Sequence, residues 1–423
     1  MGEPNAALES SGASPFITKV FAFFMILPFA AAPVLSVHFS KSLAYIMPAC
    51  GLIGALVLFA GFKRIPDLPK GLMTYAGAVL ALAAASILWA FYPDEATERV
   101  IKLVVLIVFS LLFIGTARAG RDQIPISGLM DAALIACSFA ALLLTADILN
   151  DGFFYRLTRG ELETPLYSTA VYNKASIVIA VIAACAFLLH PAGATLKRAF
   201  FLIPLIGMLY FIQGQAIQVG VAIGLIIYCL FPYKFRWAWL VAYVLIVAGF
   251  AAKPIIAPVA YNELAQSFQS VEYMQQAYAA HRLEIWDYIS REIWASPFIG
   301  HGIEFTRSFD GFDSAKVFLP EVNPIHPHSF ILQIWIEFGM LGAVFALIGI
   351  GLLMKSIYGI ENVRTKRTAF SALAVLMFIA SITFNLWQSW WLVFLLMVAA
   401  LFMMVVKTPD PDIIKGKELP TSA

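Results

Sequence analysis

Long apolar stretches, separated by short polar turns, follow one another along most of the chain. A helix needs about 20 mainly apolar residues to cross the hydrocarbon layer of a membrane, which is roughly 30 Å thick. Because lipid offers the backbone no hydrogen bonds, repeated stretches of this kind predict a bundle of membrane-spanning helices. We therefore expect an all-α integral membrane protein with about twelve spans. They lie near residues 16–36, 43–62, 71–92, 100–119, 128–149, 171–190, 199–213, 214–232, 236–253, 328–354, 368–385 and 389–407.

Two longer polar segments divide this series of spans. The first lies near residues 150–174, and the second covers residues 254–327 and is long enough to contain short helices of its own. The predicted organisation is a tail at residues 1–15, nine spans over residues 16–253, the large loop, three spans over residues 328–407 and a tail at residues 408–423.

Lysine and arginine recur at every second connection between the expected spans. Cytoplasmic loops of membrane proteins carry an excess of these residues. Sixteen of the 28 basic residues fall in connections that share one side, whereas the short loops on the other side contain almost none. We therefore expect both termini in the cytoplasm and both long segments outside. The sixteen are Lys63, Arg64, Lys70, Arg118, Arg121, Lys197, Arg198, Lys234, Arg236, Lys355, Arg364, Lys366, Arg367, Lys407, Lys415 and Lys417.

The composition supports a membrane protein and limits the kinds of ligand that we expect. Hydrophobic residues make up 61% of the chain and charged residues 13%, whereas about 25% is usual in soluble proteins. The net charge of +2 is too small to indicate binding to nucleic acid. The sequence has no glycine-rich nucleotide-binding loop, so we expect a donor that is already activated and can be reached from the membrane.

The strongest candidate for chemistry is His328, at the point where the large loop becomes the tenth expected span. An imidazole is suited to general-base work near neutral pH because its ordinary pKa is about 6.5. His326 competes for the same role on the same evidence, and either residue could instead be a loop histidine that only binds a carbonyl group.

Arg282 begins a stretch with Leu283, Trp286, Ile289 and Ile293 at helical spacing, which predicts an amphipathic helix against the membrane or the bundle. A guanidinium group matches phosphate oxygens in a bidentate fashion. An outward-facing arginine beside lipid therefore indicates a lipid-linked pyrophosphate, and the alternative is an ion pair with a neighbouring carboxylate.

Other polar residues are weaker candidates for binding a ligand. Arg156 and Arg159 lie in the shorter outer segment beside carboxylates, and Lys102 lies one turn inside the fourth expected span. Gln215 and its neighbouring glutamines could bind a sugar or phosphate, or satisfy a tight helix turn. For Glu337, within the tenth expected span, we favour a structural role in which it is tied to Gln333.

The spacing of these residues resembles the motifs of the O-antigen ligase family. His328 and Ser329 are followed after nine residues by Gly339 and after two more by Gly342. Upstream, the arginine-to-PxxGxG portion of the family's outer loop is matched by Arg282, Trp286, Pro297, Gly300 and Gly302.

This resemblance implies an inverting, metal-independent glycosyltransferase of the GT-C type in the bacterial inner membrane, with its active site facing the periplasm. The enzyme would transfer a polysaccharide from undecaprenyl pyrophosphate to a sugar hydroxyl of the lipid A core, without a cofactor. His328 would be the general base, and Arg282 would hold the pyrophosphate of the donor.

The chain departs from the family pattern at one place. The family commonly has a second arginine, in a Ser-Arg pair, near residue 213, where this chain reads FIQGQAIQ. The second positive charge would then come from Arg156, Arg159 or Lys102, or the donor is held differently. The alternative functions are an O-antigen or exopolysaccharide polymerase, a protein O-oligosaccharyltransferase, and a flippase or transporter, which should show broken helices near the midplane in paired positions.

Overall fold

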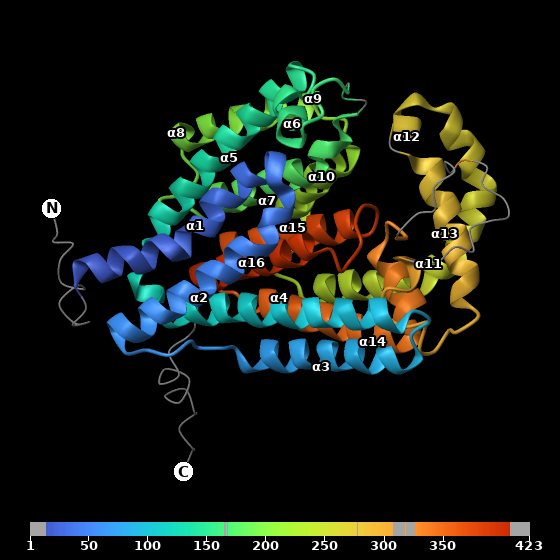
Figure 1. Ribbon diagram of the computed structural model, residues 1–423, viewed down its shortest axis with the longest axis horizontal. Coiled ribbons are helices and arrows are strands. Elements are labelled where there is room, and N and C mark those ends of the chain that lie inside the picture. The colour runs from blue at the N-terminus through green and yellow to red at the C-terminus, as the bar shows by residue number, and fades with distance from the viewer. Residues whose placement is uncertain are drawn as a thin grey trace, which may run out of the picture.

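The computed structural model describes residues 14–406 except residues 165, 167, 277, 308–317 and 319–325. Every regular element in this part of the chain is helical, in agreement with the expected all-α class (Figure 1). The α-helices are α1 (Pro15–Phe39), α2 (Leu43–Phe62), α3 (Lys70–Ser86), α4 (Pro93–Ala119), α5 (Ile126–Leu149), α6 (Phe153–Arg159), α7 (Asn173–Leu189), α8 (Leu196–Ala199), α9 (Ile203–Phe211), α10 (Gln215–Leu230), α11 (Arg236–Ser270), α12 (Glu272–Gln276), α13 (Ala279–Ile293), α14 (Phe330–Tyr358), α15 (Val363–Ala380) and α16 (Ser389–Val405).

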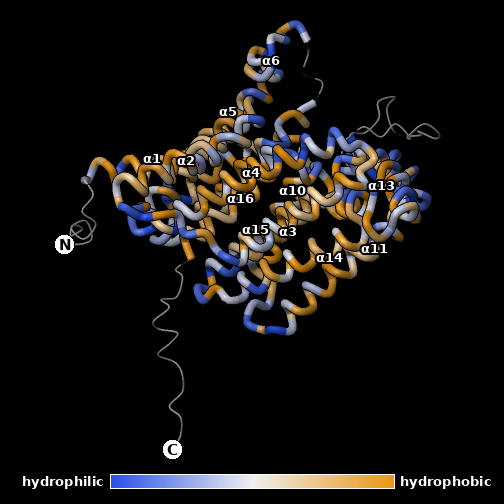
Figure 2. Tube along the Cα trace, turned by 60° about the horizontal axis from the view of Figure 1, so that its bottom comes forward, coloured by the Kyte–Doolittle hydropathy of each residue, from blue (hydrophilic) through white to orange (hydrophobic). Residues whose placement is uncertain are grey.

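Each of the twelve expected spans contains one or more of these helices. Within the described residues, seven helical stretches are long and apolar enough to cross a membrane, and the first of them, Pro15–Phe62, comprises both α1 and α2. Two shorter helices, α10 and α16, are also apolar. Apolar residues predominate along the bundle, whereas polar residues gather around α6 and α13 (Figure 2). The chain is therefore a multi-pass membrane protein, and the count of twelve crossings stays a prediction.

The basic connections expected on the cytoplasmic side contact one another. Arg64, after α2, forms an ion pair of 2.6 Å with Asp122, after α4. Arg121 donates a hydrogen bond of 2.6 Å to the backbone oxygen of Val406, after α16. Three of these connections thus lie together at one end of the bundle, as their charge pattern indicated.

Several boundaries differ by a few residues from the expected spans, and the end of α11 differs most. The ninth expected span ends at residue 253, but α11 continues to Ser270 with Pro254 and Pro258 inside it. Prolines in such a helix are tolerated when neighbouring groups compensate for the lost backbone hydrogen bonds. Here α13 packs along the extended part of α11 (Figure 1). The ammonium of Lys253 also lies 3.4 Å from the centre of the Trp286 ring of α13.

Helix α14 is broken at Gly339, whose φ of 59° and ψ of −151° are accessible only to glycine. A break in a helix leaves backbone carbonyl groups without their usual partners. The oxygens of Ile336 and Glu337 instead accept hydrogen bonds from the amides of His301 and Gly302, at 2.8 and 2.9 Å. The loop that carries the PxxGxG sequence therefore supplies the donors that the broken helix lacks.

The same loop also supplies acceptors on the other side of the break. The amides of Met340 and Leu341 donate to the backbone oxygens of Pro297 and Phe298, at 2.8 and 3.0 Å. At Gly300, an added Cβ would lie 2.3 Å from the backbone carbon of Glu337, so the two backbones touch directly. We call residues 297–302 the glycine clamp, because they hold both halves of α14.

Glu337 is fully buried and has the structural contacts that the sequence indicated. The amide of Gln333 donates to its Oε1 at 3.0 Å, and the Trp387 indole donates to its Oε2 at 2.5 Å. Gln333 also donates to Asn385 at 3.0 Å. This network joins α14 to the connection between α15 and α16, which lies next to the candidate site.

Candidate active site

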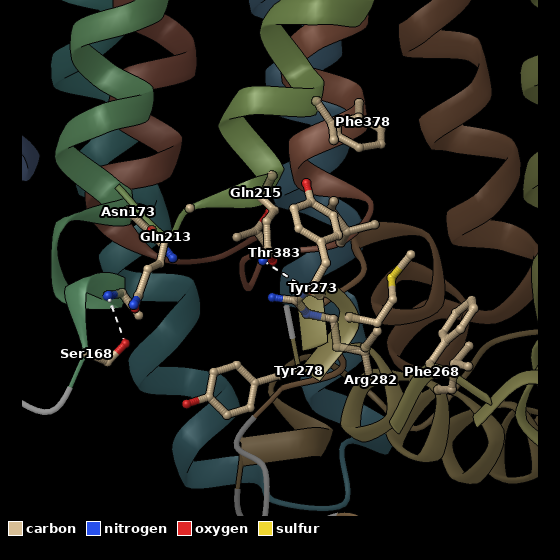
Figure 3. Close-up of a pocket in the computed structure, with 18 of the residues that line it drawn as sticks. Ser168, Asn173, Gln213, Gln215, Phe268, Tyr273, Tyr278, Arg282, Phe378 and Thr383 are labelled. Atoms are coloured by element: carbon tan, nitrogen blue, oxygen red, sulfur yellow. Dashed lines mark hydrogen bonds between the residues drawn. The ribbon is translucent and has the colours of Figure 1, made fainter. Parts of the chain in front are cut away.

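A cavity of about 270 Å³ lies where α7, α10, α11, α12, α13 and α15 come together (Figure 3). Its wall combines amide, phenol and guanidinium groups with apolar side chains, which suits a ligand that has both polar and apolar parts. The lining residues are Ser168, Ala170, Asn173, Gln213, Gly214, Gln215, Ala216, Val219, Phe268, Tyr273, Met274, Tyr278, Ala279, Arg282, Leu283, Trp286, Phe378, Ile382 and Thr383.

Helix α13 places Arg282 in this cavity. The apolar residues at helical spacing bury one face of α13, where Ile285, Ile289 and Ile293 pack in a core cluster with side chains of α14. Arg282 lies on the side of α13 that is turned toward the cavity. Its side chain points into the space between α10 and α13 (Figure 3). Burial lowers the pKa of Arg282, because little water is left to hydrate its charge. An anionic ligand would stabilise such a group.

Two carboxylates of α13 near Arg282 have contacts that help to fix the helix and the large loop. Asp287 forms an ion pair with Arg291 at 3.0 Å, one turn along α13. Glu284 accepts a hydrogen bond from the amide of Phe318 at 3.0 Å.

The second motif residue, His328, lies just before α14. Ser329 is the N-cap of the helix, and its hydroxyl accepts a hydrogen bond from the amide of Leu332 at 3.4 Å. His328 precedes the cap with a φ of 51°, in the left-handed region that few residues other than glycine adopt. Trp286, one turn after Arg282, donates to the oxygen of Pro327 at 2.8 Å, so the two motif segments are in direct contact.

The hydrogen bond of His328 determines which ring nitrogen can act as a base. Its Nδ1 lies 2.7 Å from the backbone oxygen of Thr383, which lines the cavity. A carbonyl oxygen only accepts hydrogen bonds, so Nδ1 carries the proton and Nε2 carries the lone pair. Burial and the positive charge of Arg282 lower the pKa of His328 to about 4. At neutral pH the ring is therefore uncharged and can take up a proton at Nε2.

The neighbouring His326 has the opposite arrangement. Its Nδ1 accepts a hydrogen bond of 3.2 Å from the backbone amide of His328, so the neutral ring carries its proton on Nε2. Burial lowers the pKa of His326 to about 3, with contributions from the charges of His328, Lys174 and Arg282. The centres of the two imidazole rings lie 4.1 Å apart. His326 thus presents a hydrogen-bond donor where His328 presents an acceptor.

His326 and His328 are not among the residues that line the cavity; His328 is connected to it through Thr383. Three other candidates from the sequence also lie outside the lining. Lys102 forms an ion pair with Glu98, one turn earlier on α4. Arg156 donates to the backbone oxygen of Leu162 at 2.8 Å, and the guanidinium of Arg159 lies 4.5 Å from the centre of the Tyr155 ring. Their contacts in the described residues are local to α4 and to the segment around α6.

The glutamines near the α9–α10 turn divide into two roles. Gln215 lines the cavity, and its amide donates to the backbone oxygen of Tyr273 at 3.0 Å, which connects α10 to α12 (Figure 3). Gln213 also lines the cavity. The amide of Gln218 instead donates to the oxygens of Leu209 and Ile212, at 2.8 and 3.1 Å, and so satisfies the turn.

Sequence reasoning missed several residues that the fold brings here. Thr383 acts through its backbone oxygen, which no side-chain pattern could reveal. Asn173 lines the cavity and Lys174 follows it at the start of α7, where the sequence reads as the end of a polar loop. Tyr273 and Tyr278 reach the cavity only because the chain turns back between α11 and α13.

The fold and the cavity together define a multi-pass, all-helical membrane protein with a polar site at one end of its bundle, built from an arginine and a hydrogen-bonded histidine pair. Residues 199–347 match the family model described as O-antigen ligase. This segment contains Arg282, both histidines and the glycine clamp. This match supports the O-antigen ligase family for the chain and, with it, ligase-type transfer of a glycan.

Relatives that match over most of the chain agree with this family. The chain is 26% identical over 317 residues to a Rickettsia conorii protein named "putative polysaccharide ligase", with 73% of this chain and 74% of the relative covered. A Rickettsia prowazekii protein of the same description is 24% identical over 335 residues, covering 78% of each chain. A Rickettsia typhi protein is 25% identical over 314 residues, covering 73% of this chain and 74% of the relative. No solved structure matches the chain.

Proposed function

We propose that the protein is an O-antigen ligase that transfers a polysaccharide from undecaprenyl pyrophosphate to a sugar hydroxyl of the lipid A core. The reaction is inverting and needs no metal ion, and it takes place at the periplasmic face of the bacterial inner membrane. One observation carries the proposal: Arg282 points into a cavity whose wall includes Thr383, the hydrogen-bond partner of His328.

In this proposal His328 is the general base. Its Nε2 takes the proton of the acceptor hydroxyl while the hydroxyl oxygen bonds to the anomeric carbon of the donor glycan. The Thr383 oxygen keeps the ring in the tautomer that this role requires. The bond between the anomeric carbon and the pyrophosphate oxygen breaks, and undecaprenyl pyrophosphate leaves with its electron pair.

Arg282 binds the pyrophosphate in the donor and stabilises the charge that develops on it as it leaves. A pyrophosphate leaving group needs charge stabilisation more than protonation, and a planar guanidinium provides two parallel donors. The anion also compensates for the desolvation of the guanidinium. His326, with its Nε2 proton, is suited to donate to a phosphate oxygen. The apolar lining residues and the neighbouring apolar helices suit a lipid-linked donor.

The test is a clean deletion of the gene, complemented by plasmids that express the wild type, His328→Asn or His326→Asn. Asparagine tolerates the left-handed backbone of position 328 better than most residues, so the first variant removes the base with little strain. We expect His328→Asn to give bare lipid A core, with polymer accumulating on the lipid carrier, at normal protein levels in the membrane. We expect His326→Asn to reduce transfer without abolishing it.

Lipopolysaccharide gels separate the alternatives. Core that carries a single repeat in the deletion strain would contradict ligase function and favour a polymerase. Normal lipopolysaccharide with lost exopolysaccharide or lost protein glycosylation would also contradict it. Full activity of His328→Asn would remove the general-base role from this residue.

A further inference from the structure

The first turn of α7 brings a lysine to the same corner of the site. Lys174 follows Asn173, which lines the cavity. Its ammonium lies 5.6 Å from the centre of the Trp390 ring. Trp390 packs against Phe384 with ring centres 4.9 Å apart, and Phe384 directly follows Thr383. Lys174 therefore lies near the connection between α15 and α16, whose Thr383 oxygen bonds to His328.

The charges of Lys174 and Arg282 both act on the histidine pair. Both contribute to lowering the pKa of His326, so both are close enough to act on its ring. The two cations come from α7 and α13, which are far apart in the sequence. An anion that binds beside the histidines can thus meet positive charge from two directions.

Lys174 has no acidic counterion within 4.0 Å among the ion pairs of the described part of the chain. The charges that act on it are instead those of Lys41 and Arg159, which repel it. Like charges gathered around a half-buried ammonium raise its free energy, and a bound anion removes that cost. The N-terminus of α7 adds a favourable dipole at the same place.

We propose that Lys174 binds the pyrophosphate of the donor together with Arg282, each cation serving mainly one of the two phosphates. This inference rests on the proposed function. Arg282 provides a fork for bidentate contact, and Lys174 provides a compact charge that can follow the second phosphate. The FIQGQAIQ turn then needs no arginine, because the charge comes from the neighbouring helix.

The experiment measures binding of undecaprenyl pyrophosphate and undecaprenyl phosphate to purified protein in nanodiscs of phosphatidylcholine. We expect Lys174→Met to weaken binding of the pyrophosphate lipid about tenfold to a hundredfold and binding of the monophosphate lipid much less. Lys174→Arg should retain most of the affinity, because it keeps the charge. The control is Lys366→Met, in which the ammonium lost lies 5.2 Å from the Tyr358 ring, a similar contact far from the cavity.

Several results would overturn the inference. Equal affinity of Lys174→Met and wild type for the pyrophosphate lipid, with Arg282→Met impaired, would contradict the role of Lys174 and leave the proposed function intact. If Lys174→Arg and Lys174→Met weakened binding of the pyrophosphate lipid equally, the positive charge of Lys174 would not be responsible for the binding. The same nanodiscs with added phosphatidylglycerol test bulk anionic lipid. If Lys174→Met weakened binding of phosphatidylglycerol but not of undecaprenyl pyrophosphate, Lys174 would bind bulk lipid and the inference would fail. If wild type bound undecaprenol as well as undecaprenyl pyrophosphate, the proposed function itself would fail.

Discussion

Replacement of Gly300 by alanine should test the glycine clamp, because two separate penalties meet at this residue. Its φ is +68°, and a side chain in this left-handed conformation costs about 1–2 kcal/mol. The added Cβ would also lie 2.3 Å from the carbonyl carbon of Glu337 and 2.4 Å from the amide nitrogen of Phe338. Both obstructing atoms are backbone, so the clamp must move away from α14.

The size of the second penalty follows from the hydrogen bonds that such a movement disrupts. The amides of His301 and Gly302 donate to the broken part of α14 at 2.8 and 2.9 Å. A hydrogen bond contributes about 1 kcal/mol, and a buried carbonyl left without a partner costs about 1–3 kcal/mol. With about 1–3 kcal/mol for each of the two carbonyls and about 1–2 kcal/mol for the backbone, we expect Gly300→Ala to lower the free energy of unfolding by about 3–8 kcal/mol in total.

The matched control is Gly160→Ala, at the end of α6. Gly160 has a φ of +70°, but an added Cβ there meets nothing within 4 Å. This variant should show only the backbone penalty of about 1–2 kcal/mol. The free energies of unfolding are compared by titrating dodecyl maltoside micelles with sodium dodecyl sulfate. Equal destabilisation by the two variants would refute the close packing of the clamp on α14.

Three further predictions concern the site and its supports. Because the pKa of His328 is lowered to about 4, kcat/KM should stay level from about pH 8 to about pH 5 and fall only as the pH drops toward that pKa; a fall centred near 6.5 would contradict it. Arg282→Lys should reduce kcat/KM about tenfold to a hundredfold, because a point charge replaces a bidentate contact, and wild-type rates would exclude pyrophosphate binding by this residue. Trp387→Phe should lower the free energy of unfolding by about 1–3 kcal/mol, because it removes the donor 2.5 Å from buried Glu337. Trp294→Phe, at an exposed tryptophan, is its control and should have little effect.

The helices of this protein could be predicted well from the sequence. Apolar length decides where a chain can cross lipid, and that property is local. The spacing of Leu283, Trp286 and Ile289 likewise indicated the amphipathic helix α13. The end of α11 could not be predicted in this way. Lys253 and Pro254 read as a boundary, whereas packing of α13 against α11 carries the helix to Ser270.

The sequence also supplied the main members of the site, but not their relation. His328 and Arg282 stood out through their residue types and motif spacing, and His326 competed with His328 on equal evidence. The backbone oxygen of Thr383 distinguishes the two rings, because it fixes the proton on Nδ1 of His328. No sequence pattern contains that information, since the oxygen belongs to a connection two helices away.

Sequence by itself therefore determined the class of the chain, its helical segments and the motif residues of its family, since these depend on local composition and spacing. The tertiary structure decided which charges meet. It placed Arg282 and Gln215 in the lining of one cavity and put Lys174 next to Asn173 of that lining. It left Lys102, Arg156 and Arg159 outside the lining. The physical reason is that the meeting of these side chains depends on how distant helices pack. It also depends on close backbone contacts, such as that of Gly300 with α14. Local periodicity in the sequence does not encode either of them.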